Sequence, residues 1–532
     1  MYINNKKTLD VGLFYDYIYF FMKKSVLFIS ADQWRWDCFS FMKHKNALTP
    51  NLDELAKKST VFKSHFAGIV PCGPARATML TGLYPFIHRS VTNGAPLDKR
   101  FTNIAKETRK IKYDPKLYGY TDTSWDPRYL DRKDEKNYTY ESPMEGFDPV
   151  CYLSETNSDS WGNYLNENGF KIKNTKDLYR YRNPEKGIGF IHEPYEIPTE
   201  HSDTSFLANQ VIKDLKKIND PFFMHISFLK PHPPMYVSEP WHSLINPDDI
   251  DLPFMEKTID EMSKQHPLLK EMLMKYTNEE RFSEIRFSDL NEKDIRNIKS
   301  VYFGMCAEVD HNIGKILEAL KETNQADNTM IIFTSDHGEI LGENRQWGKA
   351  GWGDCSYRIP LIINIPDTTY KLIDDFTESV DLAPTILDWL EGEIPQNWNG
   401  ESLLPTILNS QNKLPSKKYV IFDWDFRENH HSSFEENREL APEECNLSVI
   451  RTKEWKYVHF PSLPPMLFNL NEDPYETNNL AGKKNYLEIQ HELLSKLLSH
   501  RMIHQERQLS NSMLSSKGIT IKSGPANRKV IK

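Results

Sequence analysis

The 532-residue chain can bury a large core, and it exceeds what one hydrophobic core usually holds, so we expect one large domain and a smaller one. Its 66 Lys and Arg against 75 Asp and Glu give a net charge of −9 without any basic stripe, which argues against a nucleic-acid partner. The six cysteines are scattered without disulfide or metal-site spacing, which is typical of a reducing, cytoplasmic compartment.

Residues 1–21 are interpreted as an N-terminal extension. Their apolar run, 11–21, is too short to span a bilayer, is interrupted by Asp16 and has no small-residue cleavage site. We therefore expect neither a signal peptide nor a membrane anchor, and we place the start of the catalytic domain at residue 22.

Three short, continuous apolar runs, at 25–30, 221–228 and 329–335, predict buried parallel strands. In open α/β sheets, ligands bind outside the carboxyl ends of such strands. Polar residues follow each run: Asp32 and Gln33, then the Lys-Pro-His-Pro-Pro segment 230–234, then Asp336 and His337. Taken singly, such pairs are more typical of hydrogen-bonding turns than of metal ligands, whereas a metal needs ligands that converge from several segments.

Helical patterns separate these strands. Thr49 followed by Pro50 predicts an N-cap and a first helical residue, and apolar residues recur at helical spacing over 298–320. Strands alternating with helices indicate an α/β fold with a parallel-rich sheet.

The pattern changes after residue 400. Short strand candidates at 419–424, 447–451 and 456–460 predict a small antiparallel sheet, and a helix is expected over 485–508. The tail that follows has five basic residues and no acid, so we expect it to pack on a neighbouring subunit or to remain mobile. We therefore divide the chain into an extension, a catalytic domain, a C-terminal subdomain and a basic tail, at 1–21, 22–410, 411–508 and 509–532.

The stretch 71–82 is the most distinctive of the chain. It contains Cys72, a proline two residues later, Arg76, and a helix-favouring run that ends at Gly82. These features place Cys72 at a helix N-terminus, where free N–H groups and the helix dipole favour negative charge. The other five cysteines fit the ordinary role of small buried hydrophobic residues.

The run Cys-Gly-Pro-Ala-Arg at 72–76, followed by Leu-Thr-Gly at 80–82, resembles the signature of the sulfatase family, and most closely its phosphonate monoester hydrolase/phosphodiesterase branch. The segments 49–53 and 468–480 also resemble sulfatase segments. The resemblance covers most of the chain. It implies an alkaline-phosphatase-like α/β fold, with a central, mostly parallel sheet between helices and a smaller C-terminal antiparallel sheet plus helix.

The resemblance also implies the cofactors. In that family the motif cysteine is converted to formylglycine by a formylglycine-generating enzyme, and one divalent metal ion is bound. The implied ligands here are Asp32, Gln33, the modified Cys72, Asp336 and His337. Typical sulfatases present Asp-Asp and Asp-Asn at the two strand ends, which suits Ca²⁺, whereas an imidazole shifts the preference towards Mn²⁺ and similar ions.

The implied reaction is covalent catalysis by hydrated formylglycine at position 72: one hydroxyl attacks sulfur or phosphorus, and the second later expels the product. Arg76 is implied to orient the diol, Lys349 to touch the oxygens of the transferred group, and His232 to protonate the leaving oxygen. Alone, each would be an ordinary surface or loop residue.

Three further residues match positions of the substrate pocket: Asn93, Tyr120 and Asp122. Ordinary sulfatases have Gly-Lys-x-His in the region of 119–122, and phosphonate monoester hydrolases have a threonine where this chain has Asp122. If Asp122 is ionised and faces the pocket, we expect it to favour a substrate arm that carries a cation.

The resemblance therefore predicts a small-molecule ester substrate, a homo-oligomer, and hydrolysis of phosphonate monoesters or phosphodiesters, with aryl- or alkylsulfatase activity as the alternative. A silent binding protein on the same scaffold is the remaining alternative. It would be expected to lack some of the motif residues, yet all are present.

Overall fold

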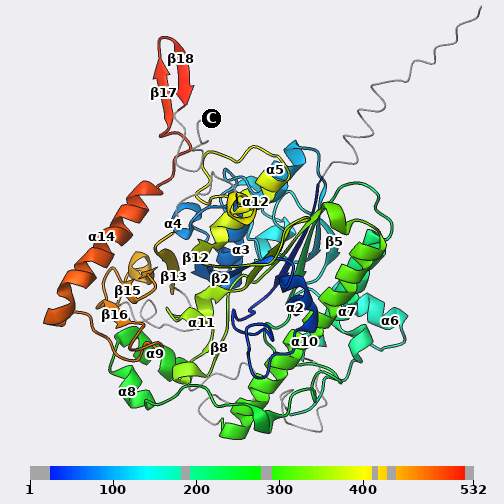
Figure 1. Ribbon diagram of the computed structural model, residues 1–532, viewed down its shortest axis with the longest axis horizontal. Coiled ribbons are helices and arrows are strands. Elements are labelled where there is room, and N and C mark those ends of the chain that lie inside the picture. The colour runs from blue at the N-terminus through cyan, green and yellow to red at the C-terminus, as the bar shows by residue number, and fades with distance from the viewer. Residues whose placement is uncertain (1–23, 181–191, 277–289, 410–416, 428–438, 522–532) are drawn as a thin grey trace, which may run out of the picture.

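The computed structural model describes residues 24–180, 192–276, 290–409, 417–427 and 439–521 (Figure 1). Its central element is a nine-stranded sheet. The strands are β1 (Ser25–Ala31), β2 (Thr60–Phe66), β4 (Pro115–Gly119), β5 (Asp148–Tyr152), β6 (Phe223–Phe228), β7 (Thr329–Thr334), β10 (Arg358–Ile359), β11 (Leu361–Asn364) and β12 (Lys371–Glu378). Their order is β10-β2-β11-β7-β1-β6-β4-β5, and β12 pairs with β2.

The middle of this sheet is parallel, as predicted. Strands β7, β1, β6, β4 and β5 run parallel to one another, whereas β11 is antiparallel to both β7 and β2. The apolar runs predicted as strands at 25–30, 221–228 and 329–335 form β1, β6 and β7, so these predictions are confirmed.

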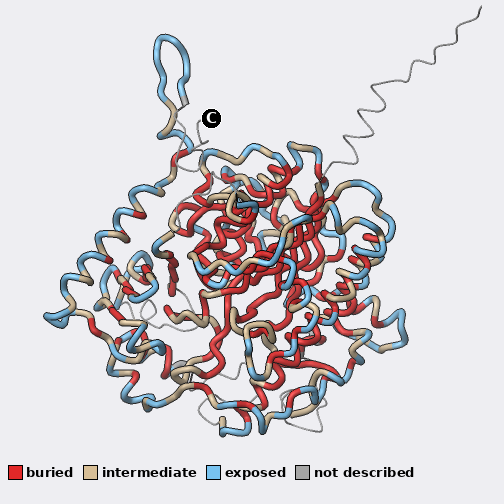
Figure 2. The backbone as a smooth tube through the Cα atoms, viewed as in Figure 1, coloured by how far each residue is buried: buried red, intermediate tan, exposed pale blue. Residues whose placement is uncertain are grey.

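Helices cover both faces of the sheet, because successive side chains of a strand point to opposite sides. Leu27 and Ile29 of β1 enter one hydrophobic cluster, with α2 (Pro50–Ala56), α7 (Asp203–Leu215) and α10 (Glu292–Glu322). Val26 and Phe28 enter the other, with α3 (Cys72–Thr81), α5 (Ile104–Lys110) and α12 (Leu382–Trp389). The buried chain is concentrated between these layers (Figure 2).

The helix predicted after Thr49 is present, but its cap is different from the expected one. The Thr49 side chain makes no capping bond to the backbone and instead donates to Asp53 Oδ1 at 2.9 Å. The backbone N–H groups of Asn51 and Leu52, in the first turn of the helix, donate to the Asp310 carboxylate of α10 at 3.1 and 2.8 Å. A residue distant in sequence satisfies this helix end, which a local pattern cannot reveal.

A second, smaller sheet has the order β16-β15-β14-β13-β3. It contains β3 (Ile69–Val70), β13 (Val420–Asp425), β14 (Asn446–Arg451), β15 (Trp455–His459) and β16 (Met466–Asn469), and helix α14 (Leu487–Ile503) packs on one face. The predicted antiparallel strands are confirmed. Strand β3 was not predicted: it is parallel to β13, so a piece of the N-terminal region completes this sheet. The boundary at residue 410 stays a prediction.

The beginning of the tail forms a hairpin, β17 (Ser512–Ser515) and β18 (Gly518–Ile521), that projects from the body beyond α14 (Figure 1). We expected the tail to pack on a neighbouring subunit or to remain mobile, and these residues form a hairpin instead of an irregular segment; packing on a neighbouring subunit stays a prediction. The extension 1–21 and residues 522–532 of the tail lie outside the described residues. None of the helices in the described ranges has the length and apolarity that a bilayer crossing requires.

Candidate active site

The candidate site lies where four adjacent parallel strands end. Strands β7, β1, β6 and β4 are neighbours, so the residues that follow them meet at one edge of the sheet. They bring together Asp336 and His337, Asp32 and Gln33, Lys230 and His232, and Tyr120 and Asp122. The N-terminus of α3 faces the same edge and supplies Cys72 and Arg76.

Cys72 is the first residue of α3, as predicted, and the helix ends at Gly82 in the left-handed conformation (φ 64°). The thiol is buried, with Sγ 3.2 Å from His337 Nε2 and 2.9 Å from Lys349 Nζ. Burial, with Asp32 and Asp336 nearby, raises the pKa of the Cys72 thiol well above its usual value. The unmodified thiol is therefore a weak nucleophile at neutral pH.

Four of the predicted ligands form a compact group: the ligand atoms of Asp32, Cys72, Asp336 and His337 all lie within 4.8 Å of one another. The His337 ring contacts the carbonyl of Gly338 through Nδ1 at 3.0 Å, so that Nε2 is left to face Asp32 and Cys72. Burial lowers the pKa of His337 to about 4, so the ring is neutral at pH 7. This donor set, with two carboxylates and an imidazole of defined orientation, fits a divalent transition metal.

Arg76 connects the carboxylates of this group. The guanidinium is completely buried and donates to Asp32 Oδ2 and Asp336 Oδ2, both at 3.0 Å. It also donates to the Tyr120 carbonyl at 2.9 Å and to Ser227 Oγ of β6 at 2.6 Å. Each carboxylate uses one oxygen for Arg76. Asp32 Oδ1 faces Cys72 Sγ at 3.9 Å, whereas Asp336 Oδ1 accepts from the N–H groups of Gln33 and His337 at 3.1 and 2.9 Å.

The Gln33 side chain lies between Lys349, which was named from the sequence, and Glu339, which was not. Its Oε1 accepts from Lys349 Nζ at 2.9 Å, and its amide nitrogen donates to Glu339. Glu339 is fully buried, accepts from the Gly348 N–H at 2.8 Å, and has its pKa raised by burial to about 8. The available sequence signal for Glu339 was its position three residues after Asp336, but no motif assigned it a role.

Tyr120 faces the ligand group instead of an open pocket. Its hydroxyl donates to Asp32 Oδ2, and its ring lies 4.2 Å from the Arg76 guanidinium carbon. The position depends on Gly119, which has φ 96° and whose missing Cβ would lie 2.0 Å from the Ser227 carbonyl oxygen. Tyr120 therefore orients Asp32. Its contact with a bound substrate, which the resemblance implies, stays a prediction.

Asn93 and Asp122 lie beside Gly73, the residue after Cys72. The Gly73 N–H donates to Asn93 Oδ1 at 2.9 Å, and a Cβ on Gly73 would lie 2.9 Å from the Asp122 carbonyl oxygen. The Asp122 carboxyl is buried with Oδ2 3.9 Å from Arg76 Nε. Burial, more than any other effect, raises the pKa of Asp122 well above its usual value, which disfavours the ionised form that attraction of a cationic arm requires.

His232 is half-buried after β6, and its Nδ1 lies 2.5 Å from the Pro233 carbonyl oxygen. Burial and Lys349 lower its pKa, while Asp32 opposes this shift. Two residues before it, the Lys230 ammonium is buried between Asp203 and Glu308, at 2.9 and 2.8 Å. This ion-pair cluster, also missed from the sequence, anchors the loop of His232 to α7 and α10.

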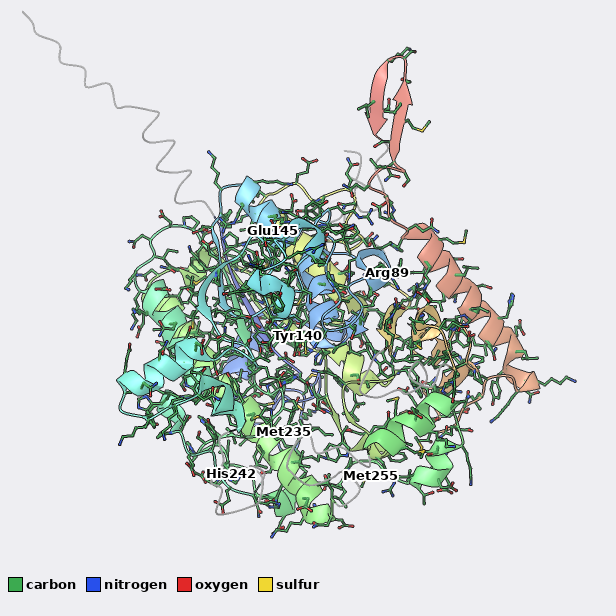
Figure 3. The ribbon with its side chains drawn as sticks, turned by 180° about the vertical axis from the view of Figure 1, so that it is seen from behind. Arg89, Tyr140, Glu145, Met235, His242 and Met255 are labelled. Carbon is green, nitrogen blue, oxygen red and sulfur yellow. The ribbon has the colours of Figure 1, made fainter. Side chains whose placement is uncertain are left out.

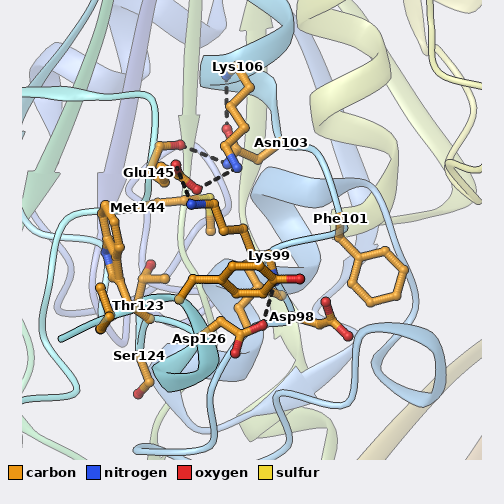
Figure 4. A pocket seen from close by; sticks show the side chains of 14 residues that line it. Asp98, Lys99, Phe101, Asn103, Lys106, Thr123, Ser124, Asp126, Met144 and Glu145 are labelled. Carbon is orange, nitrogen blue, oxygen red and sulfur yellow. Dashed lines mark hydrogen bonds and ion pairs between the residues drawn. The ribbon is translucent and has the colours of Figure 1, made fainter. Parts of the chain in front are cut away.

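A separate hollow of about 60 Å³ contains none of these residues (Figure 4). It is lined by Leu97, Asp98, Lys99, Phe101, Asn103, Lys106, Thr123, Ser124, Trp125, Asp126, Tyr129, Leu130, Met144 and Glu145. Its Glu145 pairs with Lys106 at 2.6 Å and with Lys99 at 3.8 Å. We therefore place the chemistry at the strand ends and not in this hollow.

The chain is similar to known proteins over most of its length. A sulfatase family model matches residues 24–393, and a model described as N-sulphoglucosamine sulphohydrolase, C-terminal, matches residues 342–503. The multifunctional alkaline phosphatase superfamily protein PehA of Trinickia caryophylli is 36% identical over 515 residues, covering 94% of this chain and 99% of that protein.

The crystal structure of phosphonate monoester hydrolase of Agrobacterium radiobacter is similar with a TM-score of 0.89 at 37% identity, covering 94% of this chain and 100% of that one. An arylsulfatase of Clostridium perfringens is 26% identical over 492 residues, covering 88% of this chain and 92% of that protein. Each of these three similarities covers at least 88% of this chain and at least 92% of the other protein.

Proposed function

We propose, from the premise that this chain belongs to the sulfatase family of the alkaline phosphatase superfamily and is a hydrolase, that it cleaves phosphonate monoesters and phosphodiesters. The similarity to phosphonate monoester hydrolase of Agrobacterium radiobacter, at 37% identity over its whole length, supports this substrate class. The charges of the site support it independently.

The observation that carries the proposal is the shortage of cations beside Cys72. Tyr120 and Asp122 stand where ordinary sulfatases have a lysine and a histidine, and neither is positively charged. Arg76 is already paired with two carboxylates, which leaves Lys349 as the cation in contact with Cys72. A second anionic charge on the substrate would lack a partner in a buried site, and that is costly. Esters with one negative charge are therefore favoured.

We propose that Asp32, Asp336 and His337, with Gln33 and position 72, hold one divalent metal ion, with Mn²⁺ preferred over Ca²⁺. We further propose that Cys72 is converted to formylglycine, because the raised pKa of the thiol makes the unmodified side chain a poor nucleophile. When present, the metal would supply Lewis-acid stabilisation of the transferred group, and a hydrated formylglycine at position 72 would supply the oxygen nucleophile.

The surrounding residues have separable roles. Lys349, 2.9 Å from Cys72 Sγ, is placed to hold an oxygen of the transferred group. Arg76 fixes the two carboxylates and orients position 72. His232 keeps Nε2 for proton exchange with the leaving oxygen, because Nδ1 contacts the Pro233 carbonyl.

A substrate panel tests the proposal. A sulfate monoester, a phosphodiester, a phosphonate monoester and a phosphate monoester with one common leaving group are compared by kcat/KM. We expect the diester and the phosphonate to be preferred and the doubly charged phosphate monoester to be the poorest substrate. A tenfold or larger preference for the sulfate monoester, about 1.4 kcal/mol of transition-state binding, would contradict the proposal.

The alternative is a sulfuric ester hydrolase, an aryl- or alkylsulfatase. The similarity to the arylsulfatase of Clostridium perfringens and the sulfatase family model favour it, although the identity of 26% is lower. A silent binding protein would require the loss of some catalytic groups, whereas Cys72, Arg76, Lys349, Asp32 and Asp336 are all in place. The same panel decides among the three.

We also propose a cytoplasmic, homo-oligomeric enzyme that needs a formylglycine-generating enzyme for maturation. The six cysteines are free, which supports a reducing compartment. The hairpin β17–β18 exposes Met513, Leu514 and Ile519, which gives it apolar surface for a second subunit. Light scattering of the full chain and of a variant truncated after residue 509 tests the oligomer: we expect the truncation to lower the molar mass.

A further inference from the structure

The Asp122 carboxyl has no hydrogen-bond donor among the residues that the structure describes. The residue is 6% exposed, and its Oδ1 is buried without a partner. Its Oδ2 lies 3.9 Å from Arg76 Nε, beyond hydrogen-bond distance. A buried polar atom usually has a hydrogen-bond partner, and the described residues supply none for this oxygen.

Arg76 donates no hydrogen bond to this third carboxyl. Its N–H groups are directed to Asp336, Asp32, the Tyr120 carbonyl and Ser227, at 2.6 to 3.0 Å. An ionised carboxylate that is buried without donors is strongly disfavoured, whereas the protonated form is not.

The neighbours of Asp122 favour protonation from several elements. Burial contributes most to the raised pKa of Asp122. The negative charges of Asp32, Glu141 and Asp336 raise it further, and Arg76 lowers it. Glu141 lies on the loop that carries Tyr140, labelled near the middle of the molecule in Figure 3, and this loop pairs with the Asp122 segment through Thr123 and Ser142. A bound cation would offset Asp32 and Asp336, but the burial would remain.

The Asp122 segment borders the nucleophile position. Because Gly73 has no Cβ, the Asp122 carbonyl and Asn93 Oδ1 both approach the residue next to Cys72. The Asp122 carboxyl lies at the same edge, because its Oδ2 is 3.9 Å from Nε of Arg76, which is one helical turn after Cys72 in α3. A substrate oxygen beside Cys72 is therefore the natural partner for the carboxyl.

We propose that Asp122 is a neutral carboxylic acid whose O–H donates a hydrogen bond to an oxygen of the substrate's anionic group. A protonated carboxyl adds a donor without adding charge, which suits the singly charged substrates of the proposed function, on which this inference rests. It replaces the threonine hydroxyl of related hydrolases by a group that is equally neutral.

The backbone determines which variants are informative. Asp122 has φ 47°, a conformation that asparagine and glycine tolerate and that strains β-branched threonine. Asp122→Asn keeps the shape and an N–H donor but cannot ionise, and Asp122→Gly removes the donor. In metal-loaded, converted enzyme with a phosphodiester, we expect kcat/KM to fall about threefold in D122N and at least thirtyfold in D122G. Equal losses in both variants would overturn the donor role.

Infrared difference spectra of substrate-free enzyme test the protonation separately. We expect the wild-type minus D122N spectrum at pH 7.5 to contain the C=O band of a protonated carboxyl, and carboxylate bands alone would overturn the inference. If the panel shows sulfate monoesters to be preferred while this band is present, the substrate class is wrong and Asp122 is still neutral. A loss in D122N confined to substrates with a quaternary ammonium arm would show an ionised Asp122 and overturn the inference.

Discussion

Two sides of the site differ in how completely their polar groups are paired. The ligand side comprises Asp32, Asp336, His337, Arg76 and Tyr120, and its members bond to one another. The arm side comprises Asn93, Asp122 and His232. On this side the structure shows one bond for Asn93, one for His232 and none for the Asp122 carboxyl within the described residues.

This difference separates chemistry from selectivity. The ligand side is preorganised before any substrate arrives, which is what stabilising a developing charge requires. The arm side keeps polar atoms available, so its contacts are completed by the substrate. Substitutions on the ligand side should affect all substrates, and those on the arm side should discriminate between them.

The largest effect is expected at Cys72, where the two sides meet. Cys72→Ala should lower kcat by about 10⁴-fold or more for every substrate, because the nucleophile is lost. The fold should be unchanged, since alanine fits the buried position, and circular dichroism with the thermal midpoint checks this. Activity above one per cent of wild type, in protein free of contaminating hydrolase, would show that Cys72 is not the nucleophile.

The next effect is expected at His232 and should depend on the leaving group. His232→Asn should lower kcat/KM by about 10²- to 10⁴-fold for an alkyl diester, whose leaving oxygen needs a proton, and only a few-fold for a 4-nitrophenyl diester. Equal losses on both substrates would point to a structural role.

The pH dependence provides a second measurement on His232. Because burial and Lys349 lower its pKa, the imidazole is neutral at pH 7, and the proton-donating form accumulates only as the pH falls. We expect kcat/KM for the alkyl diester to rise as the pH decreases towards that lowered pKa, and we expect the rise to be absent in His232→Asn. The thermal midpoint at each pH serves as the control.

A smaller effect is expected for Tyr120, which contacts the metal ligands from outside. Tyr120→Phe removes the hydroxyl that donates to Asp32 and should weaken metal binding by about 10- to 100-fold. Calorimetric titration of metal-free protein measures this. If the affinity is unchanged and only KM rises, Tyr120 belongs to the arm side and the comparison of the two sides fails.

The sequence predicted the ligand side better than the arm side, for a physical reason. Buried parallel strands leave continuous apolar runs, so the positions of Asp32 and Asp336 at strand ends followed from local pattern. The helix that begins at Cys72 followed from its proline, arginine and terminal glycine. These are short-range signals, and the structure shows the elements where they were expected.

What the sequence did not predict depends on long-range packing. The pairing of β3 with β13 joins residues more than 350 positions apart, and the Glu339 contact with Gln33 spans two strand ends. The raised pKa of Asp122 depends on its burial, and the Arg76 guanidinium 3.9 Å away donates its hydrogen bonds to other groups. No local pattern records burial of this kind, so the sequence left the charge state of Asp122 open.

The smallest effect concerns the choice of metal. His337→Asn replaces the imidazole by an amide oxygen and should reduce the ratio of Mn²⁺ to Ca²⁺ affinity by about tenfold. Elemental analysis of wild-type protein purified without chelator is the companion measurement. Stoichiometric calcium without transition metal would contradict the assigned preference.

The proposed catalysis depends most on the chemical state of residue 72. Peptide mass spectrometry of protein produced with and without a formylglycine-generating enzyme measures the fraction of aldehyde at this position, and kcat is measured on the same samples. We predict that kcat is proportional to the aldehyde fraction and extrapolates to zero for the unmodified thiol. Full activity in protein that carries only Cys72 as a thiol would contradict the account.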